Sequence, residues 1–130
     1  FKAISPYIPY GMPTEGVFSQ GFSLFHPAVD IVAPYHAPVL ATASGMVEKA
    51  EWDSILGNYV VLKHGDEYKT VYGHLSRITV TKGKFVKRGE LLGFIGNTGK
   101  STGPHLHYEV WKNGKRVDPR RFITLTGSFE

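Results

Sequence analysis

The chain has 130 residues and a mass of 14.4 kDa, the size of a single domain. Its hydrophobic share of 42% and charged share of 20% are ordinary for a globular protein, which excludes a disordered or collagen-like chain, and the lack of cysteine excludes disulfides and thiolate metal sites. A net charge of +4 favours an anionic partner, such as a nucleic acid, an anionic glycan or an acidic membrane, although no apolar run approaches the roughly 20 residues of a membrane span.

The first part of the chain predicts an irregular lead-in over residues 1–24, packed on the domain that follows. Phe1–Ser23 contains three prolines and little periodicity, and it offers one short strand at Val17–Ser19. Because the chain begins at Phe1 and not at methionine, we expect a processed product or an excised domain, with any signal peptide or anchor lost upstream.

From Ala28 onward, short segments rich in aromatic and β-branched residues alternate with turns rich in glycine and proline. The expected strands are Val29–Val32, Val39–Ala43, Met46–Ala50, Tyr59–His64, Tyr68–His74, Ile78–Val80, Leu91–Ile95 and His105–Trp111. Only Asp118–Ile123 is suited to a turn of helix, with Pro119 at its first position. This pattern predicts an all-β domain whose antiparallel β-sheets form a sandwich or a partly open, hybrid barrel.

The basic residues do not form a dense run. We interpret the tightest group as a solvated strand-turn face; its members are Lys82, Lys84, Lys87 and Arg88.

The strongest local pattern among the six histidines is His105-Leu106-His107. On a strand, residues two apart point to the same face, so His105 and His107 should stand together while Leu106 points to the core. A shared metal ion would relieve the conflict between two neighbouring imidazoles. The alternative is a pair of histidines with ordinary hydrogen bonds, and the pattern alone does not decide between them.

A second pattern, His26-x-x-x-Asp30, adds a carboxylate to the set. With His107 it would supply two imidazoles and one carboxylate, which suits a catalytic zinc with a position left for water. The helical H-E-x-x-H pattern of other zinc peptidases is absent, so a histidine that is not a ligand would have to handle the proton of the water. His74 and His105 are available, although His74 taken alone favours a structural role, on one face of its strand with Tyr72.

The segments that carry these residues resemble, in order and spacing, the LytM/lysostaphin-type zinc endopeptidases of peptidase family M23. The similar segments are HPAVDIVAP, GNYVVLKH, YKTVYGHLS, VKRGELLGFIGNTG and STGPHLHYEV. The resemblance covers roughly Phe25 to Phe122 and implies a metallopeptidase domain over residues 25–130. It also implies an all-β core with a groove that holds the metal at its floor.

The resemblance implies specific roles for five residues of this chain. His26, Asp30 and His107 would bind Zn²⁺, and His74 and His105 would be the catalytic pair. All five positions are filled, which favours a working enzyme over a non-catalytic peptidoglycan-binding or amidase-activating module of the same fold.

The activity implied by the resemblance is hydrolysis of peptide bonds in bacterial peptidoglycan, in stem-peptide crosslinks or bridges. We therefore expect peptidoglycan peptides as partners, no nucleic acid, contact with a membrane only through an upstream anchor, and a monomer in the periplasm or at the cell wall. Of the remaining residues, His36 and His64 are expected to have structural or solvent roles. Glu109 is interpreted as a solvated or ion-paired strand residue, with a hydrogen bond to a site imidazole as the alternative.

Overall fold

The computed structural model describes residues 5–21, 23 and 27–123, which form ten strands and one 3-10 helix. The elements are β1 (Val17–Gln20), β2 (Val29–Val32), β3 (Pro38–Leu40), β4 (Gly45–Asp53), β5 (Gly57–His64), β6 (Tyr68–Ile78), β7 (Phe85–Val86), β8 (Leu91–Ile95), β9 (His105–Lys112), β10 (Lys115–Val117) and η1 (Pro119–Phe122). None of the described residues forms a helix long and apolar enough to cross a membrane.

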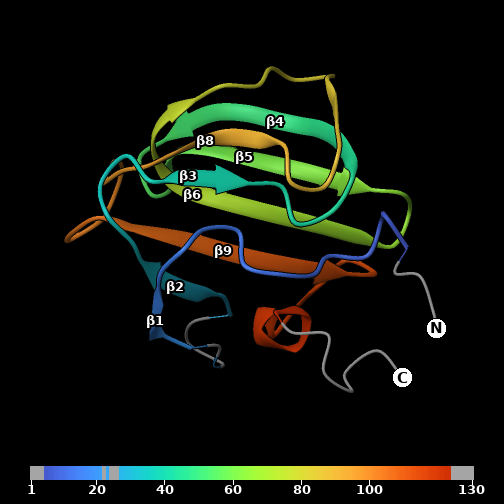
Figure 1. Cartoon of the computed structure of the whole chain (residues 1–130), viewed down its shortest axis with the longest axis horizontal. Helices are drawn as coiled ribbons and strands as arrows, with labels where there is room; N and C mark the ends of the chain where they lie inside the picture. Colours follow the sequence, from blue (N-terminus) through green and yellow to red (C-terminus); the bar gives the residue numbers. More distant parts are fainter. Residues whose placement is uncertain (1–4, 22, 24–26, 124–130) are drawn as a thin grey trace.

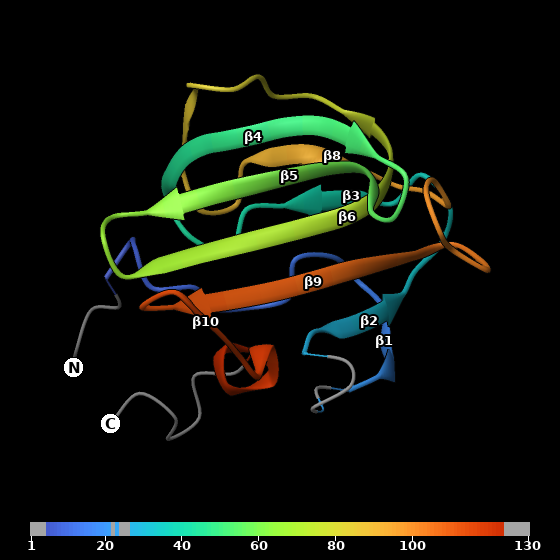
Figure 2. The same ribbon diagram turned by 180° about the vertical axis from the view of Figure 1, so that it is seen from behind.

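All strand pairs are antiparallel, in the order β1-β2-β9-β6-β5-β4-β7, with β10 beside β9. Strand β8 pairs with β3 and with the last residues of β6, from Leu75 to Ile78. As a result, β3 and β8 lie over one face of the long strands (Figure 1), whereas Figure 2 shows the opposite face. The predicted all-β, antiparallel architecture is confirmed.

The main core lies between the long strands and the β3–β8 pair. Alternation along β9 turns Leu106, Tyr108 and Val110 inward, and all three are buried. Val39 of β3 and Leu92 of β8 approach them from the covering layer and are fully buried. The other face of the sheet carries a smaller apolar cluster around Val71.

A chain of hydrogen-bonded side chains crosses this core. Tyr72 and Tyr108 face each other in the β6–β9 pair, and both hydroxyls reach Thr42 Oγ1, at 3.1 and 2.7 Å. Thr70 Oγ1 lies 2.9 Å from the Tyr72 hydroxyl and 2.7 Å from His64 Nε2. Each polar side chain in this chain therefore has a partner, as buried polar groups require. Tyr72 belongs to the core and not to a groove, and the structural role expected of His64 is confirmed.

Several predicted elements need correction. Ile78–Val80 is not a strand of its own, because β6 continues to Ile78. Strands β7 and β10 were not predicted, since two or three residues are too few to show alternation. The predicted turn of helix is confirmed as η1, with the side chain of Asp118 capping its first turn.

The interpretation of Arg88 as part of a solvated basic face is also wrong. This side chain is half-buried, and its guanidinium donates hydrogen bonds to the backbone carbonyls of Thr42, Ser5 and Ile8. Lys82, which was grouped with it, is exposed as expected.

Candidate active site

Strands β2 and β9 bring three of the predicted site residues together. Their register places Asp30 opposite His107 and Val32 opposite His105, on the face away from the main core. Asp30 Oδ1 lies 3.6 Å from His107 Nδ1 and 3.7 Å from His105 Nε2. The prediction that His105 and His107 share a face, with Leu106 on the other side, is confirmed.

His74 reaches the same site because β6 bulges. In the β5–β6 pair, Asn58 faces Leu75 but Val60 faces Tyr72, so β6 has one extra residue between these pairs. His74 has a φ of 63°, and its ring centroid lies 4.7 Å from that of His105 and 5.9 Å from that of His107. Simple alternation placed His74 on the face of Tyr72. That prediction is wrong, because the bulge turns His74 to the opposite face.

His74 and His105 are held by backbone carbonyls. The Nδ1 atom of His74 lies 2.8 Å from the carbonyl oxygen of Thr98, and Nδ1 of His105 lies 2.8 Å from that of Gly103. A carbonyl oxygen only accepts, so each Nδ1 carries a proton and each Nε2 is the nitrogen able to accept one. Burial lowers the pKa of His74, although the hydrogen bond to Thr98 acts in the opposite direction. The lowered pKa favours the neutral imidazole.

His107 is held differently, by a carboxylate. Its Nε2 lies 2.7 Å from Oε2 of Glu109, so Nδ1 is the nitrogen on the side of Asp30. Burial alone would lower the pKa of His107, but the hydrogen bonds and charges of Glu109 and Asp30 raise it to about 9. His107 therefore sits in a strongly negative environment that suits a cation. Of the interpretations of Glu109, solvation is wrong, since this side chain is buried beneath His107. It is ion-paired with Arg116, and the alternative, a hydrogen bond to a site imidazole, is present as well.

Thr98, which carries the carbonyl that holds His74, was not predicted as a site residue. Its hydroxyl donates to the carbonyl of Leu75 at 2.7 Å and accepts from the backbone N–H of Asn58 at 3.1 Å. These bonds fix the loop before β9 against β5 and β6. The glycines at 96, 99 and 103 are typical of a tight loop, but they carry no signal for this contact.

The family model of peptidase family M23 matches residues 24–119, a segment that includes β2, the bulge of β6 and the whole of β9. The chain belongs to peptidase family M23. Over 95 residues, it is 45% identical to the peptidoglycan DD-endopeptidase ShyC of Vibrio cholerae, with 73% of this chain and 22% of that protein covered. The chain spans about a fifth of the length of such relatives.

Solved structures of M23 proteins share the fold. A putative M23 peptidase from Pseudomonas aeruginosa superposes with a TM-score of 0.84 at 37% identity, covering 93% of this chain and 54% of that one. A zinc-containing peptidase from Vibrio cholerae gives a TM-score of 0.77 at 36% identity, covering 90% of this chain and 39% of that one.

The donor atoms of this M23 site suit zinc in type and spacing. Asp30 and His107 offer a carboxylate oxygen and an imidazole nitrogen 3.6 Å apart. Two ligands bound at about 2.0–2.2 Å in tetrahedral geometry lie about 3.3–3.6 Å from each other. His26, the third predicted ligand, lies outside the described residues, and the described part alone contains no group of three or more metal-binding side chains.

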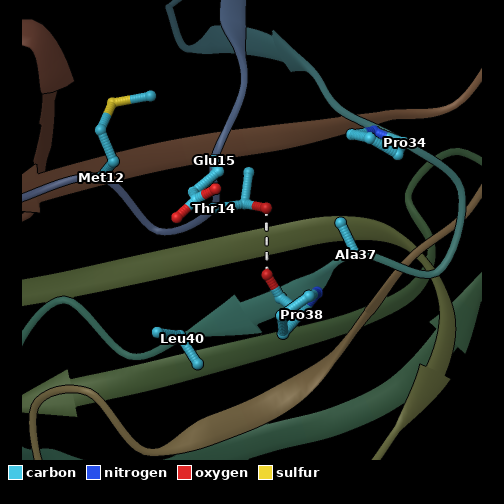
Figure 3. Close-up of a pocket in the computed structure, with 7 residues that line it drawn as sticks. All are labelled: Met12, Thr14, Glu15, Pro34, Ala37, Pro38 and Leu40. Atoms are coloured by element: carbon cyan, nitrogen blue, oxygen red, sulfur yellow. Dashed lines mark hydrogen bonds between the residues drawn. The ribbon is translucent and has the colours of Figure 1, made fainter.

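Two pockets bear on where a substrate could lie. A hollow of about 410 Å³ includes Asp30 and His105, and it extends along Val32 and Pro104. A pocket of about 470 Å³ lies elsewhere, between the segment around Met12 and Thr14 and the start of β3 (Figure 3). Its lining is mostly apolar and contains none of the predicted site residues that the structure describes.

Proposed function

We propose that this chain is the catalytic domain of a zinc endopeptidase that hydrolyses peptide bonds in bacterial peptidoglycan. The observation that carries the proposal is the convergence of Asp30, His74, His105 and His107 on one face of the sheet, from three different strands. The relative ShyC is named as a peptidoglycan DD-endopeptidase, which supports peptidoglycan stem-peptide crosslinks as the substrate.

His26, Asp30 and His107 would hold the zinc. Asp30 Oδ1 lies at similar distances from His107 and His105, and the difference in their hydrogen bonds supports His107 as the ligand. A metal-binding histidine usually donates its other ring N–H to a carboxylate, a backbone carbonyl or water, and a charged carboxylate makes the ring the more basic ligand. Glu109 backs His107 in this way, whereas a carbonyl backs His105.

A bound zinc supplies a Lewis acid that lowers the pKa of a water molecule and polarises the peptide carbonyl. The chain supplies the proton transfers. Because His74 and His105 keep their protons on Nδ1, their Nε2 atoms can take the proton of the attacking water and pass one to the leaving amine. In their protonated form they would also steady the negative charge that develops on the carbonyl oxygen.

A non-catalytic peptidoglycan-binding or amidase-activating module has less support. Such a module does not need His74 and His105 oriented with their Nε2 nitrogens available to accept protons. Action on peptidoglycan places the protein in the periplasm or outside the cell, and a monomer suffices because one chain provides the whole predicted set.

The test is incubation of the zinc-loaded chain with purified peptidoglycan, followed by mass spectrometry of the released fragments. We expect new amino and carboxyl ends at one defined peptide bond. His107→Ala and Asp30→Asn should lose both zinc and cleavage, while His74→Gln should keep zinc and lose cleavage. The exposed His36 provides a matched control, since His36→Gln should keep both. Intact crosslinks from several wall types with zinc bound would contradict the proposal, and loss of zinc from His74→Gln would contradict the division of roles.

A further inference from the structure

We propose that Glu109 is a positioning residue for His107, and that Trp111 and Arg116 hold its carboxylate in place for that purpose. The inference rests on the proposed function in one respect, the role of His107 as a metal ligand. It adds three residues, all outside the predicted set of five, that decide which imidazole nitrogen faces the metal.

The first step concerns the bond between Glu109 and His107. The two atoms, Oε2 and Nε2, lie 2.7 Å apart, and Glu109 is only 7% exposed. A buried carboxylate accepts hydrogen bonds, so His107 must carry a proton on Nε2, which leaves Nδ1, the atom beside Asp30, as the nitrogen that could bind a metal. The opposite tautomer would point a proton at the metal position.

The second step concerns the other oxygen of Glu109. The indole Nε1–H of Trp111 donates to Oε1 at 2.8 Å, so both carboxylate oxygens are held by donors. Glutamine has the same shape but one accepting oxygen, and it could not accept from His107 and Trp111 together. The site therefore requires a carboxylate specifically, and not just a polar group of that size.

The third step concerns Arg116, which strand β10 brings opposite Trp111. Its guanidinium carbon lies 5.2 Å from the centroid of the Trp111 ring, and its Nη1 lies 4.0 Å from Oε2 of Glu109. The cation thus restrains the indole by stacking and offsets the charge of the buried carboxylate. The short strand β10 connects to the metal site through these contacts.

The experiment is a double-mutant cycle of Glu109→Gln and Trp111→Phe, with zinc affinity measured by competition against a chromophoric chelator. Glu109→Gln alone should weaken zinc binding about ten- to a hundredfold. In the Trp111→Phe background the same change should cost no more than about fivefold, because the glutamine oxygen is then free to accept from His107. Imidazole nitrogen NMR shifts of the zinc-free variants, recorded above the pKa of about 9 so that His107 is neutral, should show His107 leaving the Nε2–H tautomer in Glu109→Gln and returning to it in the double variant.

Glu51→Gln is the matched control. Glu51 also accepts a hydrogen bond on this sheet, from the Tyr59 hydroxyl at 2.9 Å, but it is exposed and does not contact a histidine in the described structure. Its zinc affinity should stay within about twofold of the parent. If the parent binds zinc and cuts peptidoglycan while Glu109→Gln binds zinc equally well, the inference alone is overturned. If the parent binds no zinc, the proposed function is overturned as well.

Discussion

Each of the three site histidines within the described residues has one ring nitrogen fixed by a neighbour, and the chemical nature of that neighbour differs. Backbone carbonyls hold Nδ1 of His74 and His105, while the carboxylate of Glu109 holds Nε2 of His107. The two kinds of partner leave opposite ring nitrogens available. Three identical side chains within one site can thus take different roles because their hydrogen bonds select different tautomers.

Thr98 provides the test of this idea for His74. Thr98→Val removes the hydroxyl that bonds the Leu75 carbonyl and the Asn58 N–H, so the carbonyl beneath His74 loses its support. We expect kcat to fall about tenfold or more, because small displacements of a catalytic group are costly, with KM nearly unchanged. Thr98→Ser keeps the hydroxyl and should retain most of the activity. Steady-state cleavage of a soluble crosslinked peptide measures both; equal losses in the two variants would contradict this role for the hydroxyl.

At the scale of the element, β6 changes partners in the middle of its length. Its first half pairs with β9 up to Gly73, and its last residues pair with β8 from Leu75 onward. His74 stands at this junction, where the chain leaves one strand partner for another. The bulge that joins the two halves therefore also brings His74, the proposed proton-transfer group, beside His105.

The loop that carries Thr98 depends on close contact with the β4–β5 turn. Gly57 has a φ of +64°, and a Cβ there would lie 2.3 Å from Oγ1 and 2.4 Å from the carbonyl carbon of Thr98. Gly65 has nearly the same backbone conformation, with a φ of +63°, but a Cβ there would meet nothing within 4 Å. The two glycines separate the cost of the backbone conformation from the cost of the clash.

We therefore expect Gly65→Ala to cost about 1 kcal/mol in the free energy of unfolding, with kcat unchanged. Gly57→Ala should cost clearly more and should also lower kcat, because it displaces Thr98 from His74. Urea unfolding and cleavage kinetics of the two variants measure these effects. Similar losses of stability in both variants would mean that the loop carrying Thr98 moves away from the added methyl group without a measurable cost in the free energy of unfolding.

The sequence predicted side-chain direction correctly on strands that have one apolar and one polar face. The prediction failed where pairing with a neighbouring strand interrupts the simple alternation of side chains. On β9, apolar residues at every second position correctly predicted the face of His105 and His107. On β6, alternation misplaced His74, because nothing in the local pattern reveals a bulge that arises from pairing with β5. Glu109 was misjudged for a similar reason: its burial depends on Trp111 and on Arg116 from the unpredicted strand β10.

At the scale of the whole molecule, the sheet separates two polar systems. His74, His105 and His107 lie on one face. The hydrogen-bonded side chains of His64, Thr70, Tyr72 and Thr42 lie in the core on the other face. His64 is 1% exposed, and its Nδ1 donates to the carbonyl of Ser44. Burial lowers the pKa of His64 from 6.5 to about 4, despite that hydrogen bond.

This shift predicts a pH dependence of stability. Between pH 6.5 and about 4, the unfolded chain binds a proton at His64 that the folded chain does not. The free energy of unfolding therefore keeps its full value above pH 6.5 and falls as the pH drops through this window. The full loss amounts to about 3 kcal/mol. Unfolding by urea at several pH values should show a smaller decline in His64→Gln, which cannot titrate. An unchanged decline in that variant would assign the acid sensitivity to other groups.

The tyrosine hydroxyls in the core also resolve an ambiguity in how β9 can align. Sliding β9 by two residues along its neighbours would keep every apolar side chain inward, and it would set His105 in place of His107 opposite Asp30. Hydrophobic burial and histidine chemistry alone would hardly distinguish the two alignments. The strand shifted in this direction would bring Leu106 to the position of Tyr108, and leucine has no hydroxyl for Thr42. Thr42 thus selects one register of β9, a strand whose own apolar pattern repeats every two residues. In that register His107, which has the carboxylate of Glu109 behind it, lies opposite Asp30.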